Sequence, residues 1–390
     1  MSVRVGIVTT SFPRDAADPA GAFVAEHARW LRGQGHEVEV VSGGRPSLAP
    51  HPPHPPIPPS LHPPIAVVRV PADGLLDRGG GPEALEAGGF AWARAAVFSA
   101  RMLAAVRTRA RFWDRVFAHW LIPSAVCAAV ATRRAPVAAI AHSGDVHLLC
   151  RTGLATPVAA LLWARGATLS FVSGELRARL AAAVAGRSLR AFVDRSAVCP
   201  MGIDASRFER VPRTGPPTVL FVGRLVPVKG AQVLVDAARR LRSDAQVVIA
   251  GAGPMRAQLE QMNDQLGAGV RFAGALPYDR RHRVIASADV VVIPSIELAS
   301  GRSEGLPVVA LEAMAAGVPV VASTAGGLDS IPAAARARPG DSAALAVAID
   351  RVLSAPPDVE GARAFARHLD WQSVGPRLDR LFLEDGLTAA

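Results

Sequence analysis

The sequence is poor in lysine, cysteine, aromatic residues and long apolar runs. Lysine occurs once among the 43 lysine and arginine residues, at Lys229. The three cysteines (Cys127, Cys150 and Cys199) are scattered and odd in number, which excludes a disulfide framework or a metal cluster and is typical of a reducing cytoplasm. Aromatic residues make up 5% of a chain that is 50% hydrophobic, so its core must consist mainly of Ala, Val and Leu.

Targeting and membrane-spanning segments are not expected either. The longest apolar run, residues 120–141, is broken by Arg133, Arg134 and Pro136 and is too short to cross a bilayer. The first strand-like run begins at Arg4, which leaves no room for a signal peptide before it. We therefore expect a cytoplasmic protein.

Charge is distributed unevenly along the chain. Residues 1–200 carry 22 basic and 13 acidic side chains, whereas residues 201–390 carry 21 and 20. The first half is therefore expected to face an anionic partner or surface. Nucleic acid is one such partner, but the sequence has no helix-turn-helix, zinc-finger or aromatic RNA-binding motif, so we expect no nucleic acid.

The length of 390 residues indicates about two domains. In both halves Val-rich runs alternate with amphipathic stretches, which is typical of α/β proteins with a parallel, doubly wound sheet. We expect two Rossmann-like domains, residues 1–204 and 205–372, that face a central cleft and are joined near Met201–Asp204. Residues 373–390 predict a carboxyl-terminal helix that packs back towards the first domain.

The expected elements follow from the positions of these runs. The segment Pro46–Pro64 contains ten prolines and three histidines, which predicts a polyproline-like surface segment. A metal-binding histidine tract is the alternative. In the first half we expect helices at 24–37 and 89–120 and strands at 4–10, 38–42, 66–70, 137–141, 168–172 and 197–199.

The long helical stretch at 89–120 combines arginines with aromatic residues, among them Arg107, Arg111, Trp92 and Phe98. Basic side chains beside interfacial aromatics are typical of a helix that lies on an anionic lipid surface. A buried amphipathic helix with a solvated arginine face explains the same pattern.

The segment Thr218–Gly230 (TVLFVGRLVPVKG) contains the single lysine. It predicts a buried strand that ends at Gly223, then Arg224, a short loop, and Lys229 at the start of a helix. Ligands of open α/β sheets bind beyond the carboxyl ends of the strands. We therefore expect the arginine and the lysine of this loop to bind a diphosphate together. A lysine retained by chance on a solvated loop is the alternative.

Two glutamates eight residues apart, Glu304 and Glu312, flank the start of a predicted helix. Helix amino-termini bind phosphate, and carboxylates accept hydrogen bonds from sugar hydroxyls. Alternatively, Glu304 interacts with the helix dipole and Glu312 is a solvated helix residue about two turns in. The GAGPM segment (Gly251–Met255) lacks the third glycine of a dinucleotide fingerprint, so we interpret it as a tight strand-to-helix turn.

These motifs occur in an order that resembles the retaining glycosyltransferases of family 4, which have the two-domain GT-B fold. In the second half the resemblance rests on GRLVPVKG, the Glu304–Glu312 spacing, EAMAAGVPVVAS and Gly326–Gly327. In the first half it rests on residues 19–42, AHSGDVHLL and VCPMGID, so it covers nearly the whole chain. The chain departs from the family pattern at Gly144, Met201 and Leu328–Asp329.

The resemblance implies specific roles. It implies that Arg224 and Lys229 hold the donor diphosphate, that Glu304 contacts the transferred sugar, and that Glu312 holds the ribose. It also implies that the backbone of the two residues after Glu304 binds sugar and phosphate, that Gly21 lets its loop approach the diphosphate, and that His142 lies beside the anomeric carbon. The expected catalytic residues are His142, Arg224, Lys229 and Glu304, and the expected donor-binding residues are Gly21, Gly223, Gly305, Leu306 and Glu312.

The resemblance thus implies a metal-independent, retaining, hexosyltransferase-like enzyme. It would move a sugar from a nucleotide diphosphate sugar, a co-substrate rather than a cofactor, to a glycan or lipid-linked acceptor. Cell-surface polysaccharide or glycolipid synthesis is the expected setting, with the protein peripheral at the inner face of the cytoplasmic membrane. The alternatives are a non-catalytic nucleotide-sugar-binding scaffold of the same fold and a nucleotide-dependent dehydrogenase.

Overall fold

The computed structural model describes residues 2–15, 18, 20–44, 65–75, 85, 88–212 and 214–382, and these form two compact units. The first unit comprises Met1–Gly202 together with Trp371–Ala390, and the second comprises Ile203–Asp370. The predicted polyproline-like segment Pro46–Pro64 lies outside the described residues.

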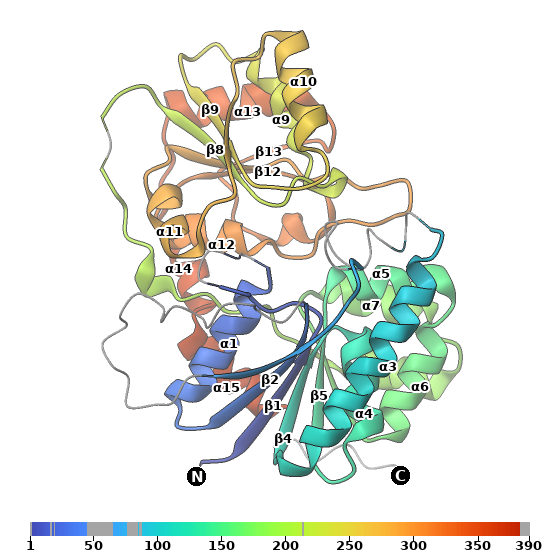
Figure 1. Ribbon diagram of the computed structural model, residues 1–390. Coiled ribbons are helices and arrows are strands. Elements are labelled where there is room, and N and C mark those ends of the chain that lie inside the picture. The colour runs from blue at the N-terminus through green and yellow to red at the C-terminus, as the bar shows by residue number, and fades with distance from the viewer. Residues whose placement is uncertain are drawn as a thin grey trace. The chain divides into compact units, whose positions relative to one another are not determined.

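The first unit is built on a seven-stranded parallel sheet with the strand order β3-β2-β1-β4-β5-β6-β7 (Figure 1). Its central strands are buried on both faces, which is why they appear in the sequence as continuous apolar runs. The strands are β1 (Arg4–Thr9), β2 (Glu37–Gly43), β3 (Ala66–Val70), β4 (Arg115–His119), β5 (Val137–Ala141), β6 (Thr168–Phe171) and β7 (Ala197–Val198).

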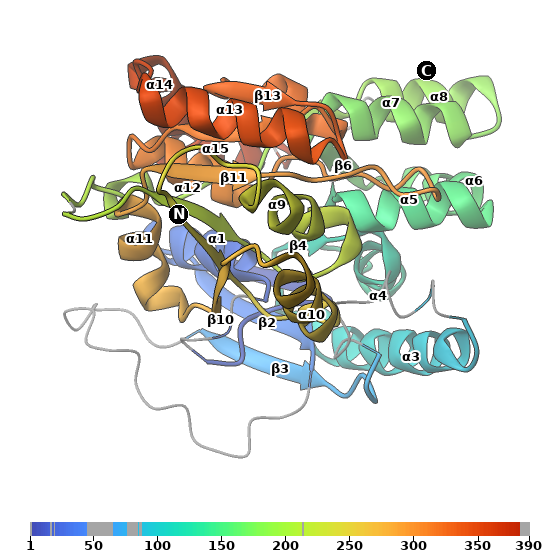
Figure 2. The same ribbon diagram turned by 90° about the horizontal axis from the view of Figure 1, so that it is seen from above.

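Helices cover this sheet, and α3, α4 and α6 lie side by side (Figures 1 and 2). They are α1 (Ala22–Gly33), α3 (Ala91–Arg109), α4 (Val126–Ala131), α5 (Ser143–Thr152), α6 (Ala155–Ala164), α7 (Gly174–Ala183), α8 (Arg187–Asp194) and α15 (Trp371–Arg380).

Helix α15 is part of the first unit although it follows the second unit in sequence. It packs against α1, where the Trp371 indole N–H donates to Glu26 Oε2 at 3.2 Å. Gly375 lies so close to Trp30 that an added Cβ would be 2.1 Å from the indole ring. The carboxyl-terminal helix therefore completes the core of the first unit.

The second unit contains a six-stranded parallel sheet with the order β10-β9-β8-β11-β12-β13. Helices α9, α10 and α13 pack on one face of this sheet, and α11, α12 and α14 pack on the other (Figure 1). The strands are β8 (Thr218–Val222), β9 (Gln246–Ala250), β10 (Arg271–Gly274), β11 (Val290–Ile293), β12 (Val320–Ser323) and β13 (Ala335–Ala337). The helices are α9 (Ala231–Ala238), α10 (Arg256–Leu266), α11 (Tyr278–Ala286), α12 (Val308–Ala315), α13 (Ser342–Ser354) and α14 (Glu360–His368).

The two parallel sheets confirm the predicted α/β class, but one long predicted helix is wrong. The segment 89–120 is helical only to Phe112, through α3 and a short 3-10 turn, and residues 115–119 form β4 at the centre of the sheet. The run Val116–Ala118 is fully buried, and the helical pattern of the preceding arginines concealed this short apolar strand.

Among the described residues, no single helix is long and apolar enough to cross a bilayer. The pair α5 and α6 passes a test of length and composition only when the two helices are taken together, and they are bent by 115°.

Candidate functional site

Lys229 and Glu304 lie together in the second unit although 75 residues separate them in sequence. The Lys229 ammonium forms an ion pair with Glu304 Oε1, and the Ser295 hydroxyl donates to Glu304 Oε2. The Lys229 and Glu304 side chains are 22% and 11% exposed, while Ser295 is completely buried. Both carboxylate oxygens are therefore held, and the ammonium remains at a partly open position.

The backbone that carries Lys229 is a single 3-10 turn, Pro227–Lys229, followed by Gly230 in the left-handed region (φ 69°). Helix α9 begins at Ala231, so Lys229 precedes the helix rather than starting it. A Cβ at Gly230 would lie 1.8 Å from the carbonyl oxygen of Pro294. Only glycine lets this turn approach the end of β11 so closely, and that approach brings Lys229 to Glu304.

Arg224 and Gly223 lie on the loop that leaves β8. Gly223 and Leu225 donate backbone hydrogen bonds to Ala250 and Ala252, so this loop runs beside the turn after β9. A Cβ at Gly251 would lie 1.8 Å from the Gly223 carbonyl oxygen. The glycine-rich GAGPM segment is therefore a tight turn, as predicted, and its glycines allow the Arg224 loop to pack against it.

The Gly326–Gly327 turn supports the backbone of Glu304 and Gly305. Gly327 N–H donates to the Glu304 carbonyl at 3.0 Å, and Cβ atoms at Gly326 and Gly327 would lie 2.3 Å and 2.7 Å from the carbonyl oxygens of Glu304 and Gly305. Leu306 is half-buried on the same loop, between Gly305 and α12. The two glycines thus fix the strand-to-helix loop on which the predicted sugar contacts lie.

Glu312 lies one turn into α12, rather than two, and is only 3% exposed. The alternative of a solvated helix residue is therefore wrong. Its Oε2 lies 2.5 Å from Arg281 Nη2 of α11, and burial raises the pKa of this carboxyl although the Arg281 charge opposes the shift. Arg281 had no signal in the sequence, because its helix differs little from any amphipathic segment.

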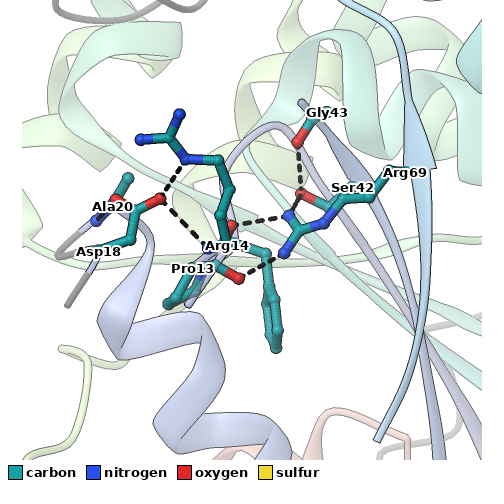
Figure 3. A network of polar contacts seen from close by, with 8 residues as sticks. Pro13, Arg14, Asp18, Ala20, Ser42, Gly43 and Arg69 are labelled. Atoms are coloured by element: carbon teal, nitrogen blue, oxygen red, sulfur yellow. Dashed lines mark hydrogen bonds and ion pairs between the residues drawn. The ribbon is translucent and has the colours of Figure 1, made fainter. Parts of the chain in front are cut away.

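In the first unit, the loop between β1 and α1 is held by two charged side chains (Figure 3). Arg69 of β3 donates to the carbonyl oxygens of Phe12, at 2.8 Å, and Pro13. Buried Asp18 accepts from Arg14 Nε at 2.6 Å and from the Ala20 backbone at 3.0 Å. These contacts tie the loop to the carboxyl edge of the first sheet.

Gly21 ends this loop in the left-handed conformation (φ 68°) and serves as the amino-terminal cap of α1. A Cβ there would lie 2.2 Å from the Ser11 carbonyl oxygen. Close packing of the loop on itself therefore explains why this position is occupied by glycine. The expected approach of this loop to a diphosphate stays a prediction.

His142 follows β5 and caps α5. The imidazole accepts from the backbone N–H of Asp145, while the Asp145 carboxylate accepts from the backbone N–H of His142 at 2.9 Å. His142 is 8% exposed, and burial lowers its pKa to about 3. Burial also raises the pKa of Asp145 to about 7, although backbone donors oppose the shift. His142 is thus a neutral capping residue in this structure.

The described residues contain no group of three or more His, Cys, Asp or Glu side chains arranged to hold a metal ion. The structure brings Lys229 and Glu304 together, and Gly305 follows Glu304 directly in sequence. Glu312 is paired separately with Arg281. Sequence reasoning missed Ser295 and Arg281 in the second unit and Arg69 in the first, because each contributes through a contact with a residue distant in the sequence.

Known structures share this architecture of two parallel-sheet units with charged residues at the ends of their strands. The structure of HepE from Anabaena in complex with UDP-glucose matches with a TM-score of 0.69 at 17% identity, covering 98% of this chain and 99% of that one. The protein has the GT-B fold. Residues 202–368, which span nearly all of the second unit, match the family Glycosyl transferases group 1.

The matches to the following two curated relatives each cover less than half of the chain. An uncharacterized glycosyltransferase of Methanocaldococcus jannaschii is 47% identical over 117 residues, which are 29% of this chain and 28% of that protein. The GDP-mannose-dependent alpha-(1-6)-phosphatidylinositol monomannoside mannosyltransferase of Mycobacterium tuberculosis is 36% identical over 176 residues, 41% of this chain and 44% of that protein. The chain spans half or less of the length of the curated relatives it matches.

Proposed function

We propose that this protein is a retaining glycosyltransferase that moves a sugar from a nucleotide diphosphate sugar to a glycan or lipid-linked acceptor. One observation carries the proposal: Lys229, Glu304 and Ser295 form a fixed polar cluster within the segment that matches the family. Two of these residues are those to which the resemblance gives roles at the diphosphate and the sugar. The proposed setting is synthesis of a cell-surface polysaccharide or glycolipid.

The chemistry of the cluster suits departure of a nucleotide diphosphate. Breaking the sugar–phosphate bond builds negative charge on the leaving oxygen, and cations held in place before the reaction stabilise that charge. We assign this work to the Lys229 ammonium and the Arg224 guanidinium, which lie on one loop after β8. Glu304 is proposed to accept hydrogen bonds from the sugar, with Ser295 holding the carboxylate in place.

Donor binding is tested first, by thermal unfolding with uridine and guanosine nucleotides. UDP-glucose and GDP-mannose are the first probes, because matching proteins are named for binding or using them. A ligand that binds only the folded state at about 100 times its Kd stabilises it by roughly 2.7 kcal/mol. We expect one nucleoside diphosphate to raise the melting temperature by several degrees, and the matching monophosphate or nucleoside to raise it much less.

Turnover separates an enzyme from a non-catalytic scaffold. The donor that stabilises the protein should be hydrolysed slowly, or transferred to an added acceptor, and both reactions should continue in excess chelator. Stabilisation without turnover of any donor, across glycan and lipid acceptors, would favour the scaffold. Stabilisation by a nicotinamide nucleotide instead would favour the dehydrogenase.

We further propose that the α3 side of the first unit binds an anionic membrane surface. Phe90, Trp92 and Phe112 are 83%, 43% and 42% exposed at the two ends of this helical segment. Arginines on α3 and in the turn after it are exposed beside them, whereas Arg115 belongs to β4 and the Trp113 side chain is buried. Two of these cations pair with carboxylates, since Arg101 contacts Asp73 and Arg109 contacts Glu39.

Changing Arg94, Arg107 and Arg111 together to glutamine should weaken binding to anionic vesicles. Each arginine near an anionic surface contributes about 1 kcal/mol, so the triple change should reduce affinity by a factor of roughly 100 at low salt. Co-sedimentation measures the effect, and the triple variant Arg271, Arg351 and Arg367 to glutamine in the second unit is a control of equal charge. Equal binding of unmodified protein to neutral and anionic vesicles, or none to either, would contradict the proposal.

A further inference from the structure

Three buried histidines form a continuous chain inside the first unit. His27 Nδ1 of α1 lies 3.1 Å from His119 Nε2 at the end of β4, and His119 Nδ1 lies 3.3 Å from His142 Nε2. His27 and His119 are completely buried, and His142 is 8% exposed. The chain therefore runs from α1, through the middle of the sheet, to the residue that caps α5 at the carboxyl edge of β5.

The cap of α5 fixes the direction in which the three histidines donate hydrogen bonds to one another. His142 Nε2 faces His119, so the nitrogen that accepts from the Asp145 backbone N–H is Nδ1, which then carries no proton. A neutral imidazole has one N–H and one acceptor nitrogen, so His142 carries its proton on Nε2 and donates to His119 Nδ1. By the same rule His119 carries its proton on Nε2 and donates to His27 Nδ1, which leaves the proton of His27 on Nε2.

Aromatic rings pack against the histidines at both ends of this row, His142 and His27. The rings of Phe23 and Trp120 lie against His142, with centroids 5.2 Å and 4.8 Å away. At the other end Trp371 of α15 stacks on His27, at 5.2 Å with 6° between the ring planes, and His27 Nε2 has no hydrogen-bond partner among the described residues. Burial lowers the pKa of His27 and of His142 to about 3 and that of His119 well below its usual value, which agrees with three neutral rings.

We propose that His119 and His27 are positioning residues for His142. They hold its imidazole in one orientation and in the tautomer protonated on Nε2, so that His142 presents a fixed, neutral ring edge to the ligand instead of acting as an acid or a base. Both ring nitrogens of His142 are already engaged within the first unit. This inference rests on the proposed function for its catalytic consequence, but the tautomers are a property of the unliganded protein.

The tautomers are tested by nitrogen-15 NMR of histidine-labelled protein without substrate. We expect His27, His119 and His142 each to show a protonated Nε2 and an unprotonated Nδ1 at neutral pH. A protonated Nδ1 on His142 or His119 would overturn the proposal. This measurement needs no turnover, so its outcome is independent of whether the protein proves to be a glycosyltransferase.

The catalytic consequence is tested with two variants of similar polarity at the central histidine. The amide of asparagine in His119→Asn sits near the position of Nδ1 and can keep the contact with His142, whereas the longer His119→Gln reaches towards His27 and gives up that contact. We expect kcat to fall less than about threefold in His119→Asn and roughly tenfold or more in His119→Gln, at similar melting temperatures. Equal kcat in both folded variants would overturn the positioning role; no transfer by the unmodified protein would instead overturn the proposed function.

Discussion

Replacing Lys229 with alanine is expected to reduce kcat/KM for sugar transfer by a factor of roughly 30 to 1,000. This factor corresponds to about 2–4 kcal/mol of lost transition-state stabilisation, the usual effect of removing a preorganised charge stabiliser. The physical reason is that the variant loses a cation, held by Glu304 on the loop that follows β8, which is proposed to stabilise the negative charge on the departing diphosphate. Steady-state kinetics with the donor identified by thermal unfolding measures the change.

The same substitution also leaves Glu304 without its cation, and a second variant separates this effect from catalysis. In Lys229→Ala combined with Glu304→Gln, no unpaired carboxylate remains, so the free energy of unfolding should recover relative to Lys229→Ala. Arg239→Ala, which removes an exposed cation paired with Asp236 in the same unit, is the control and should leave kcat/KM unchanged. Near-normal turnover by Lys229→Ala would remove this residue from the proposed role.

Gly230→Ala is expected to lower the free energy of unfolding by about 2–4 kcal/mol. Two costs add in this variant: a side chain in the left-handed region, and the overlap of the new Cβ with the Pro294 carbonyl oxygen. Because Gly230 brings the Lys229 turn against the end of β11, any fraction that folds should also have a misplaced Lys229 and reduced transfer. Chemical denaturation measures the first effect, and kinetics of the folded protein measures the second.

Gly267→Ala is a matched control for this prediction. Gly267 also has a left-handed backbone (φ 56°), but no atom lies within 4 Å of an added Cβ. It should therefore show only the conformational cost of about 1 kcal/mol, without loss of activity. Equal destabilisation by both alanines would mean that the turn at Gly230 can move away from Pro294 at little cost.

The sequence predicted the parts of this fold that depend on neighbouring residues. Apolar runs identified β1, β5 and β8, and the order of motifs along Gly223–Gly327 predicted which loops carry charged residues. Strand β4 was missed because its five residues follow an arginine-rich helix without a turn signal that separates the two patterns. Short apolar runs cannot be assigned to a strand or a helix by periodicity alone.

The contacts within the candidate site could not be predicted in the same way. Nothing near Ser295 indicates that its hydroxyl meets Glu304, and nothing near His27 indicates that its ring meets His119, 92 residues away. Such contacts depend on which strands become neighbours, and the sheet order is a property of the whole unit. The roles assigned to Arg224, Leu306 and Glu312 stay predictions until a donor is bound.

The placement of α15 in the first unit has a consequence for synthesis of the chain on the ribosome. The second unit is continuous and can fold once Asp370 has emerged, but the first unit still lacks the helix that covers Trp30 and His27. At about 5–20 residues per second, the intervening segment Ile203–Asp370 takes on the order of ten seconds or more to translate. During that time the incomplete apolar face around α1 is exposed to other nascent chains and to chaperones, although this unit was made first.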